Sequence, residues 1–443
     1  MKFDPFRSLK TAWALGVLCL FVTTGGVIWK AWDMYGPLHK PMLQGWDDSF
    51  YYYWLPAVVI NHNLDFAPLL AHSGTGAAWT RVPGLDQPPH TSMGLFPNKY
   101  PLGWALGSLP FFLAANIHAP KGSTGFEPRY LMTVCLGQML YAALGLWLAI
   151  KIIARYFPLL TAFFAVAIGW LASPLIYYQS VRIWLSHSQV FVLAMALFWV
   201  ALNLWDNKGR YLSWAALGFF AAMLVVTRNL SAVYLVFPAL VIVCRLRSPI
   251  AAVALLGGFL GPVFLQLLAW KLIYGSWILY TYTGERFDFG HMHLWQIFFS
   301  PFHGWFYWHP LLLVGMMGFV FWIPQRAEGW AWTASFAAIA ILNAAWWCWW
   351  LGSSFGNRGF EVPTFFAMMG LALLIHRSQP FPVWRGMLAT ICGLAIIWNL
   401  LLFTMYLGHR IERQSPVTYS TAARAMVNFA FGIPASEYRT SAP

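Results

Sequence analysis

Long apolar runs separated by short polar segments dominate the chain. Each run approaches the roughly 17–25 residues that a helix needs to cross a bilayer, although 229–244 and 361–376 are slightly short. The pattern predicts an all-α polytopic membrane protein with about eleven membrane-spanning helices. The expected spans are 11–31, 129–150, 158–177, 185–205, 211–227, 229–244, 249–274, 305–324, 329–350, 361–376 and 384–406.

The charges in the short loops set the expected orientation. If Met1 is cytoplasmic, every loop on that side is basic, as the positive-inside rule requires. Of the 14 acidic residues, only Asp4, Asp206 and Glu328 fall on that side. The basic loop residues are Lys151, Arg155, Lys208, Arg210, Arg245, Arg247, Arg326, Arg377 and Arg385. A cytoplasmic N-terminus and a periplasmic C-terminus follow from this pattern.

The first outer loop, 32–128, contains two apolar stretches that we do not expect to span the membrane. The first, 54–66, has the pattern of a short amphipathic helix that lies on the membrane. The second, 102–117, would reverse the side of all later loops if it crossed, so we expect an interfacial or re-entrant helix. Pro110 within it favours a bent, non-spanning element.

The remaining segments contain no separate soluble domain. Residues 1–406 are expected to form one transmembrane domain, with a second outer loop at 275–304. The tail, 407–443, is polar and has too few apolar residues for a domain of its own. The stretch 71–101 is rich in Pro and Gly, which predicts an irregular flap.

Composition excludes several classes of protein. Of the 443 residues, 60% are hydrophobic and 9% are charged, and the mean hydropathy is +0.60, which excludes an ordinary soluble domain. The net charge of +13 is explained by the cytoplasmic loops, so nucleic acid is not an expected partner. The five cysteines lie in different apolar runs, which indicates neither a disulfide framework nor a zinc site. No small-residue cleavage site follows the first run, so it is expected to stay as a helix.

Two adjacent carboxylates, Asp47 and Asp48, stand at the head of an aromatic run in the first outer loop. Acidic side chains beside a bilayer are costly unless they are solvated or used, which favours a catalytic role for the pair. One carboxylate can act as a general base on an acceptor hydroxyl, or it can bind a divalent cation. The structural alternative is an N-cap of a helix that begins near Ser49, but a cap needs only one aspartate.

Four basic residues at outer helix ends depart from the positive-inside trend. Their side chains can bind a lipid phosphate, and a guanidinium fork matches phosphate oxygens well. The alternative is snorkelling to the outer headgroups or pairing with a nearby acid. The four are Lys99, Arg182, Arg228 and, in a loop bracketed by glycines, Arg358.

The second outer loop supplies further candidates for the site. Glu285 and Asp288 can complete a metal or sugar site, and the alternative is a solvated loop with an internal ion pair to Arg286. His303 and His187 can act as ligands or transfer protons, whereas a single histidine near an interface more often makes a structural hydrogen bond. The abundant tryptophans predict an interfacial aromatic belt, and sugar stacking by one or two of them stays open.

Four segments, in this order, resemble the GT-C-fold glycosyltransferases that use polyprenyl-phosphate-linked sugars. That group includes the protein O-mannosyltransferases and the aminoarabinose transferase of lipid A, and the match is clearest to members without a soluble domain. The resemblance covers most of 45–365. The segments are Asp47-Asp48 ahead of an aromatic juxtamembrane helix, Tyr100-Pro101-Leu102-Gly103, Ser300-Pro301-Phe302-His303-Gly304-Trp305, and Ser354-Phe355-Gly356-Asn357-Arg358 with Pro363.

The resemblance implies that one carboxylate of the acidic pair is the catalytic acid or base and that Arg358 faces the donor phosphate. Members commonly have Asp-Glu where this chain has Asp-Asp, so the resemblance leaves open which aspartate is the base. Members also differ in metal dependence, so no metal ligand is predicted and a divalent cation stays an open alternative. The substrate-binding residues expected on this basis are Lys99, Tyr100, Arg182, Arg228, Glu285, His303 and Arg358.

The predicted function is that of a glycosyltransferase of the bacterial inner membrane. It would transfer a sugar from a polyprenyl-phosphate donor to a hydroxyl of a glycan, lipid or protein acceptor, at a periplasmic site between the first loop, the Glu285 loop and the Arg358 loop. The first alternative is a transporter or flippase of a lipid-linked or small anionic solute, which needs polar residues near the midplane. The few polar residues within the spans include Gln138, Gln266 and Asn343. The second alternative, a non-catalytic assembly partner, leaves the acidic pair unexplained.

Overall fold

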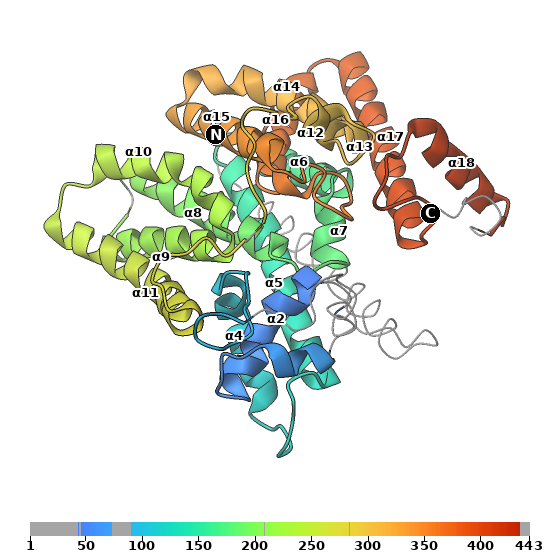
Figure 1. The fold of residues 1–443 in the computed structure, drawn as a ribbon. Coiled ribbons are helices and arrows are strands. Elements are labelled where there is room, and N and C mark those ends of the chain that lie inside the picture. The colour runs from blue at the N-terminus through green and yellow to red at the C-terminus, as the bar shows by residue number, and fades with distance from the viewer. Residues whose placement is uncertain (1–42, 44–45, 73–89, 208, 283, 435–443) are drawn as a thin grey trace. The chain divides into compact units, whose positions relative to one another are not determined.

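The computed structural model describes residues 43, 46–72, 90–207, 209–282 and 284–434 (Figure 1). Within these ranges the chain is helical and contains no strand, only an isolated bridge between Phe287 and Trp346. It divides into two compact units. Unit 1 comprises the described parts of Met1–Leu148 and Tyr178–Gly284, and unit 2 those of Ala149–Tyr177 and Glu285–Pro443.

Helices make up both units. Those of unit 1 are α2 (Trp46–Val59), η1 (Ala67–His72), α4 (Gly103–Asn116), α8 (His187–Trp205), α9 (Tyr211–Thr227), η2 (Asn229–Leu235), α10 (Val236–Arg245) and α11 (Pro249–Tyr274). Those of unit 2 are α6 (Leu159–Leu171), α12 (Gln296–Phe299), α13 (Trp305–Trp308), α14 (Pro310–Trp322), η3 (Ile323–Gln325), α15 (Ala327–Ala345), η4 (Arg358–Phe360), α16 (Pro363–Ser378), α17 (Pro382–Leu407) and α18 (Tyr419–Ala430). Two helices, α5 (Pro128–Ile153) and α7 (Leu175–Ser180), have residues in both units.

The all-α polytopic fold predicted from the sequence is confirmed. Among the described residues, α5, α8, α11 and α17 are long and apolar enough to cross a membrane, and several shorter apolar helices accompany them. The predicted span 11–31 lies outside the described residues, and each of the other predicted spans coincides with one or more helices. The protein is therefore a membrane protein whose helices follow its apolar runs.

Some predicted spans are interrupted in the structure. The predicted span 305–324 contains α13, α14 and η3 in succession. His309, between α13 and α14, has φ −129° and ψ 72°, outside the helical region. This follows from Pro310, because a proline disfavours the helical conformation of the residue before it and is well suited to begin the next helix.

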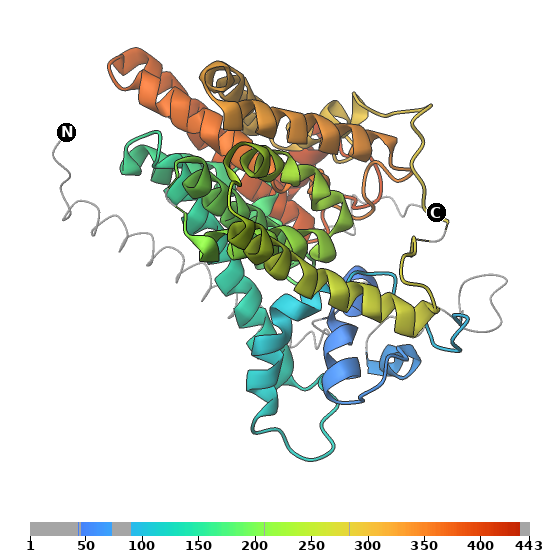
Figure 2. The same cartoon turned by 90° about the vertical axis from the view of Figure 1, so that its left-hand side faces the viewer.

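Unit 1 combines a group of long helices with the helices of the first loop. α9 lies between α8 and α11, and α2 and α4 lie side by side near α5 (Figure 1 and Figure 2). A Cβ at Gly218 of α9 or Gly258 of α11 would overlap the backbone of the facing helix. Small residues at such crossings are typical of membrane helices, because they let two backbones approach closely.

The two predicted juxtamembrane helices are present, but α2 differs from its expected bounds. It begins at Trp46 rather than near Ser49 and ends at Val59, so the prediction of a helix over 54–66 is wrong. The side chains from Phe50 to Leu55 are all buried, so α2 packs on all sides rather than exposing one polar face. α4 contains Pro110, as expected, and is fixed to its neighbours by Ser108, whose hydroxyl accepts hydrogen bonds from Gln138 (2.8 Å) and Gln189 (3.0 Å).

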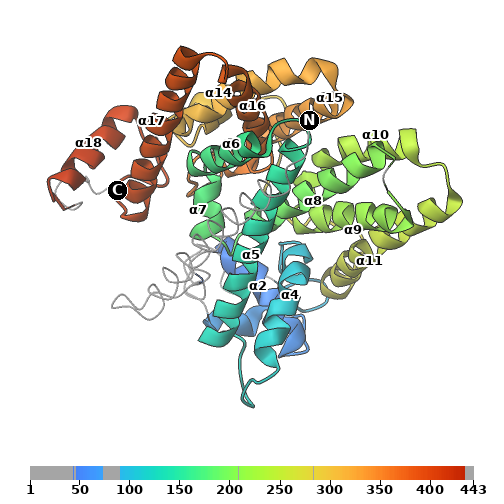
Figure 3. The ribbon, with the colours of Figure 1, turned by 180° about the vertical axis from the view of Figure 1, so that it is seen from behind.

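In unit 2, α16 lies between α6 and α14, and α17 lies beside α18 (Figure 3). α14 and α16 cross through Gly315, Gly318 and Gly370, where a Cβ would overlap the facing backbone. Helix α18 lies in the tail that the sequence analysis treated as a polar segment. Tyr419, at its start, stacks on Tyr307 of α13 with ring centroids 4.2 Å apart, so the described part of the tail packs against unit 2.

Candidate functional site

The two adjacent aspartates lie in the first turn of α2, where the helix dipole favours negative charge, and their environments differ. Asp48 is 1% exposed and forms an ion pair with Arg182, with Oδ1 and Nη2 2.9 Å apart. Asp47 is half-buried, and its Oδ1 accepts a hydrogen bond of 2.5 Å from the hydroxyl of Tyr100. The pair therefore consists of one internal, ion-paired carboxylate and one that is more accessible.

Arg182 reaches Asp48 from the connection between α7 and α8, and its side chain is 24% exposed. A buried carboxylate needs such a partner, because an uncompensated buried charge is strongly destabilising. Arg182 was predicted as a substrate-binding residue, with pairing to an acid as its alternative. The geometry supports the pairing alternative.

Tyr100 belongs to a short segment, Asn98 to Leu102, that leads into α4. This segment is tied to α2 by two buried hydrogen bonds. The side-chain amide of Asn98 donates to the carbonyl of Phe50 at 2.8 Å, and the indole of Trp54 donates to the carbonyl of Tyr100 at 3.2 Å. The hydroxyl of Tyr100 is thereby held close to the start of α2.

The same segment is also fixed from α11 and the loop after it. Gln266 accepts a hydrogen bond from the backbone N–H of Leu102 at 2.7 Å, and Tyr274 donates to the carbonyl of Asn98 at 3.0 Å. Thr281 donates to the carbonyl of Lys99 at 2.7 Å. With donors and acceptors on both sides, this segment is one of the most firmly held parts of unit 1.

Lys99 places a cation beside the ring of Tyr100, whose hydroxyl is bonded to Asp47. Its Nζ lies 5.4 Å from the ring centroid of Tyr100 and 5.2 Å from that of Tyr282, distances at which a cation is attracted to an aromatic face. Burial, followed by the charge of Asp47, raises the pKa of Tyr100 well above its ordinary value, so the phenol stays protonated and remains a donor. A carboxylate, a phenol and an ammonium group thus meet in unit 1.

Arg228, another predicted cation, lies at the C-terminal end of α9 and is half-buried. The end of this helix touches the start of α4, because a Cβ at Gly103 would overlap the backbone of Val226 and Thr227. Arg228 therefore directly follows the part of α9 that contacts the start of α4. Lys99 and Tyr100 lie just before α4 in the chain.

The predicted site residues of unit 2 share an electrostatic neighbourhood around Cys348. Arg358 and Glu285 both act electrostatically on the Cys348 thiol, with opposite signs. Arg358 also acts on the pKa of His303. Glu285, His303 and Arg358, which are not adjacent in sequence, therefore lie in one region of unit 2.

His303 is buried, and its Nε2 lies 3.1 Å from the carbonyl oxygen of Arg413 in the tail. Burial lowers its pKa to about 3, and the positive charge of Arg358 acts in the same direction. The imidazole is neutral at physiological pH, which favours the structural hydrogen bond over proton transfer. His187 likewise begins α8 as a buried residue and packs its ring against Tyr178, with centroids 4.4 Å apart.

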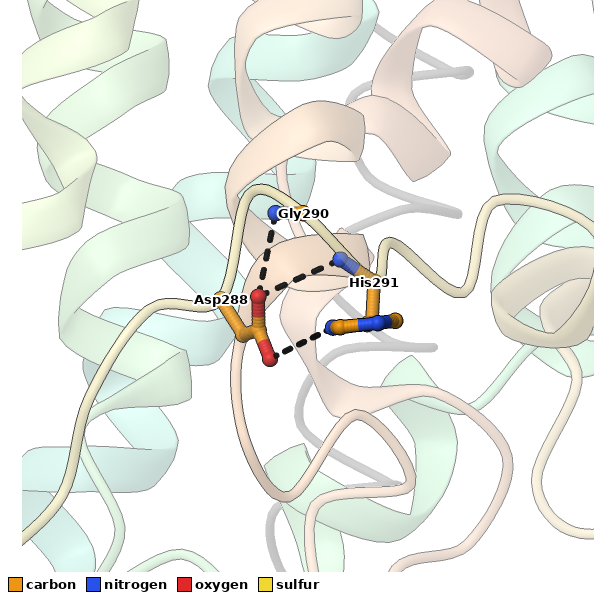
Figure 4. Close-up of polar contacts among 3 residues, drawn as sticks. All are labelled: Asp288, Gly290 and His291. Carbon is orange, nitrogen blue, oxygen red and sulfur yellow. Dashed lines mark hydrogen bonds and ion pairs between the residues drawn. The ribbon is translucent and has the colours of Figure 1, made fainter.

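The carboxylate of Asp288, in the second outer loop, is hydrogen-bonded to residues that follow it closely in the chain. Its Oδ1 accepts the backbone N–H of Gly290 at 3.0 Å and of His291 at 3.2 Å, and its Oδ2 lies 3.1 Å from Nδ1 of His291 (Figure 4). The hydrogen bond from His291 is the main reason why the pKa of Asp288 is lowered. Among the described residues, no group of three or more His, Cys, Asp or Glu side chains could hold a metal ion.

Several residues that build these clusters were not predicted as part of a site. In unit 1 they are Asn98, Gln266, Tyr274 and Thr281, and in unit 2 they are Asn343, Asn399 and His309. A signal existed for most of them, since a polar residue inside an apolar run is costly and usually has a specific partner. Gln266 and Asn343 carried that signal, but it indicated transport as readily as support for a site.

Comparison with known proteins gives a likeness in fold. No protein-family model and no curated protein sequence matches the chain. A solved structure does: the crystal structure of ArnT from Cupriavidus metallidurans bound to undecaprenyl phosphate, with a TM-score of 0.50. The two are 14% identical, and the match covers 96% of this chain and 75% of the ArnT chain. At this identity the likeness concerns the fold, and the chain has the GT-C-like fold that its segments predicted.

Proposed function

We propose that this chain is a membrane glycosyltransferase that uses a polyprenyl-phosphate-linked sugar and glycosylates a hydroxyl of a glycan, lipid or protein acceptor on the periplasmic side. The observation that carries the proposal is the meeting of Asp47, Tyr100 and Lys99 at the head of α2, on a GT-C-like fold. The ArnT structure, which holds undecaprenyl phosphate, supports the donor class.

Asp47 is the proposed base, since Asp48 is buried and already paired with Arg182. The carboxylate of Asp47 would take the proton of the acceptor hydroxyl as that oxygen bonds to the anomeric carbon. The bond from the anomeric carbon to the phosphate oxygen breaks in the same step, and polyprenyl phosphate leaves with the electron pair. Attack from the side opposite the leaving group inverts the anomeric configuration.

The leaving phosphate needs positive charge, because negative charge develops on it as the bond breaks. Arg358 is the proposed phosphate ligand, and Lys99, Arg228 and Glu285 are proposed as further substrate contacts. A divalent cation would do the same work as these side chains, so chelation is a separate arm of the test. Tyr100 supports the base by holding Asp47 in one orientation.

The contacts of the polar residues within the predicted spans favour the enzyme over the transporter. A transporter would use the polar residues of the spans for its cargo. Instead, Gln138 donates to Ser108 at 2.8 Å and Gln266 accepts from Leu102 at 2.7 Å, while Asn343 lies directly against Gly359. These side chains take part in packing between segments of the fold.

Mass spectrometry of the purified protein, incubated with a panel of undecaprenyl-phosphate sugars and membrane acceptors, tests the proposal. Wild type is compared with Asp47→Asn and Asp48→Asn, each with and without a chelator. We expect transfer in the wild type and its loss in Asp47→Asn. A donor that is bound but never consumed with any acceptor would favour the transporter, and transfer by Asp47→Asn at the normal rate would exclude the proposed base.

A further inference from the structure

Arg358 lies between two glycines, Gly356 and Gly359, and each is in contact with a buried polar side chain from a different segment of unit 2. A Cβ at Gly356 would overlap Nε2 of His309, and a Cβ at Gly359 would overlap the amide of Asn343. His309 precedes α14 and Asn343 lies in α15, and each is 1% exposed. The loop that carries Arg358 therefore rests directly on two internal polar groups.

His309 is itself held by a third buried polar residue. Its Nδ1 lies 2.8 Å from Oδ1 of Asn399 in α17. The amide nitrogen of Asn399 donates to the carbonyls of Leu171 (2.7 Å) and Ser173 (3.2 Å), which fixes its orientation and leaves its oxygen facing the histidine. Nδ1 of His309 is therefore the donor to Asn399, and its Nε2 faces Gly356.

The loop on either side of Arg358 is also fixed by its own contacts. Ser354 donates to the carbonyl of Gly356 at 2.6 Å, and Asn357 accepts from the backbone N–H of Gly359 at 3.0 Å. The buried ring of Phe360 stacks on Trp305 with centroids 4.7 Å apart. By contrast, Arg358 is only half-buried.

We propose that His309, Asn399 and Asn343 are positioning residues that hold residues 354–360 so that the guanidinium of Arg358 meets the phosphate of the lipid-linked donor. This inference rests on the proposed function, because it needs Arg358 as a phosphate ligand. Burying a polar side chain in an apolar helix bundle costs free energy. A role in holding the Arg358 loop would explain why His309 and Asn343 are buried against Gly356 and Gly359. A displacement of about 1 Å at a substrate-orienting group is enough for a large loss of activity.

The binding of undecaprenyl phosphate to the purified chain, measured by titration with native mass spectrometry, tests the inference. We expect Asn343→Ala and Asn399→Leu each to raise the dissociation constant about tenfold, which is what one weakened phosphate contact is worth. Where the sugar donor is known, its KM should rise by a similar factor with little change in kcat, because a contact made throughout the reaction is lost. A merely structural role would lower the thermal stability and leave the affinity of the folded protein unchanged.

A second, independent test introduces a steric clash between residue 359 and Asn343 and then removes it. Gly359 has no left-handed backbone angle, so Gly359→Ala acts only by pushing a methyl group into Asn343. We expect Gly359→Ala to weaken binding of undecaprenyl phosphate by clearly more than Asn343→Ala does alone, and the double variant to return to about the affinity of Asn343→Ala. The matched control is Gly393→Ala in α17, where a Cβ would meet nothing and binding should stay normal.

The outcome for Arg358→Gln separates this inference from the function on which it rests. If wild type does not bind undecaprenyl phosphate, or if Arg358→Gln binds it normally, the assigned role of Arg358 is wrong and the inference falls with it. If Arg358→Gln weakens binding while Asn343→Ala, Asn399→Leu and Gly359→Ala do not, the proposed function stands and the positioning role is overturned.

Discussion

The two candidate clusters of this protein use buried polar groups in different ways. In unit 1 the groups are ionised or bonded to an ion, as in the pair of Asp48 with Arg182 and the bond from Tyr100 to Asp47. In unit 2 the groups beneath Arg358 are neutral side chains, His309 and Asn399 joined to each other and Asn343 under Gly359. The first cluster is held together mainly by charged groups, and the second mainly by the close packing of neutral side chains against the Arg358 loop.

The difference follows from what a buried group costs. A buried charge is tolerated only with a close partner, so removing either member of the pair exposes the full penalty. A neutral amide or imidazole costs less to bury and can be satisfied by ordinary hydrogen bonds. The unit with the proposed base thus keeps charge where it can react, and in the other unit neutral groups fix the loop of one half-buried cation, Arg358.

Asp47→Asn should have the largest effect on activity, since it removes the proposed base from the more accessible member of the pair. We expect transfer to fall roughly 10²- to 10⁴-fold, the usual contribution of general base catalysis, with little change in thermal stability. Initial rates and thermal unfolding of the same preparation measure both. Asp288→Asn, the same change in a locally bonded acid of unit 2, is the control and should be fully active.

Arg182→Gln should have the largest effect on stability. It leaves Asp48 buried without its ion-pair partner, at an expected cost of about 3–5 kcal/mol in the free energy of unfolding. The double variant Asp48→Asn with Arg182→Gln should recover much of that loss, because no buried charge remains. Equal instability of the single and double variants in denaturant titrations would show that the ion pair is not the reason.

His303→Gln probes the neutral groups of unit 2 through pH. The pKa of His303 is lowered to about 3, so the unfolded chain binds the proton first as the pH falls below about 6.5. Its contribution to the free energy of unfolding is therefore present above that pH and is lost progressively toward pH 3. The loss at pH 5 is about 2 kcal/mol. Unfolding at pH 7 and pH 5 should show a smaller pH-dependent loss in His303→Gln than in wild type, and an equal loss in both would contradict this.

Tyr100→Phe should have the smallest effect of the four, because it keeps the ring and removes only the bond to Asp47. We expect about a tenfold lower kcat with a small change in KM, the value of one hydrogen bond to a charged group. Tyr211→Phe, at the exposed start of α9, is the matched control. Normal kcat in Tyr100→Phe would mean that Asp47 does not depend on this phenol for its orientation.

Much of the fold could be predicted from the sequence, because membrane-spanning helices are local features. A run of apolar residues satisfies its own backbone hydrogen bonds as a helix, whatever its neighbours are. Span 249–274, for example, coincides with α11 (Pro249–Tyr274). The start of α2 could not be placed as well, since the rings that follow the aspartates are buried by residues from α4 and other distant segments.

Hydropathy and isolated charge are properties of short segments, so the amino-acid sequence was enough to predict a helical membrane protein and to select the acidic pair and Arg358 as candidates. The pairing of Asp48 with Arg182, which lies 134 residues away, and the bond between Asp47 and Tyr100 are visible only in the folded chain. The meeting of His309, Asn343 and Asn399 around the Arg358 loop of unit 2 is visible only there as well. Two adjacent aspartates are equivalent in a sequence, and they differ once packing has buried one beside an arginine and left the other within reach of solvent.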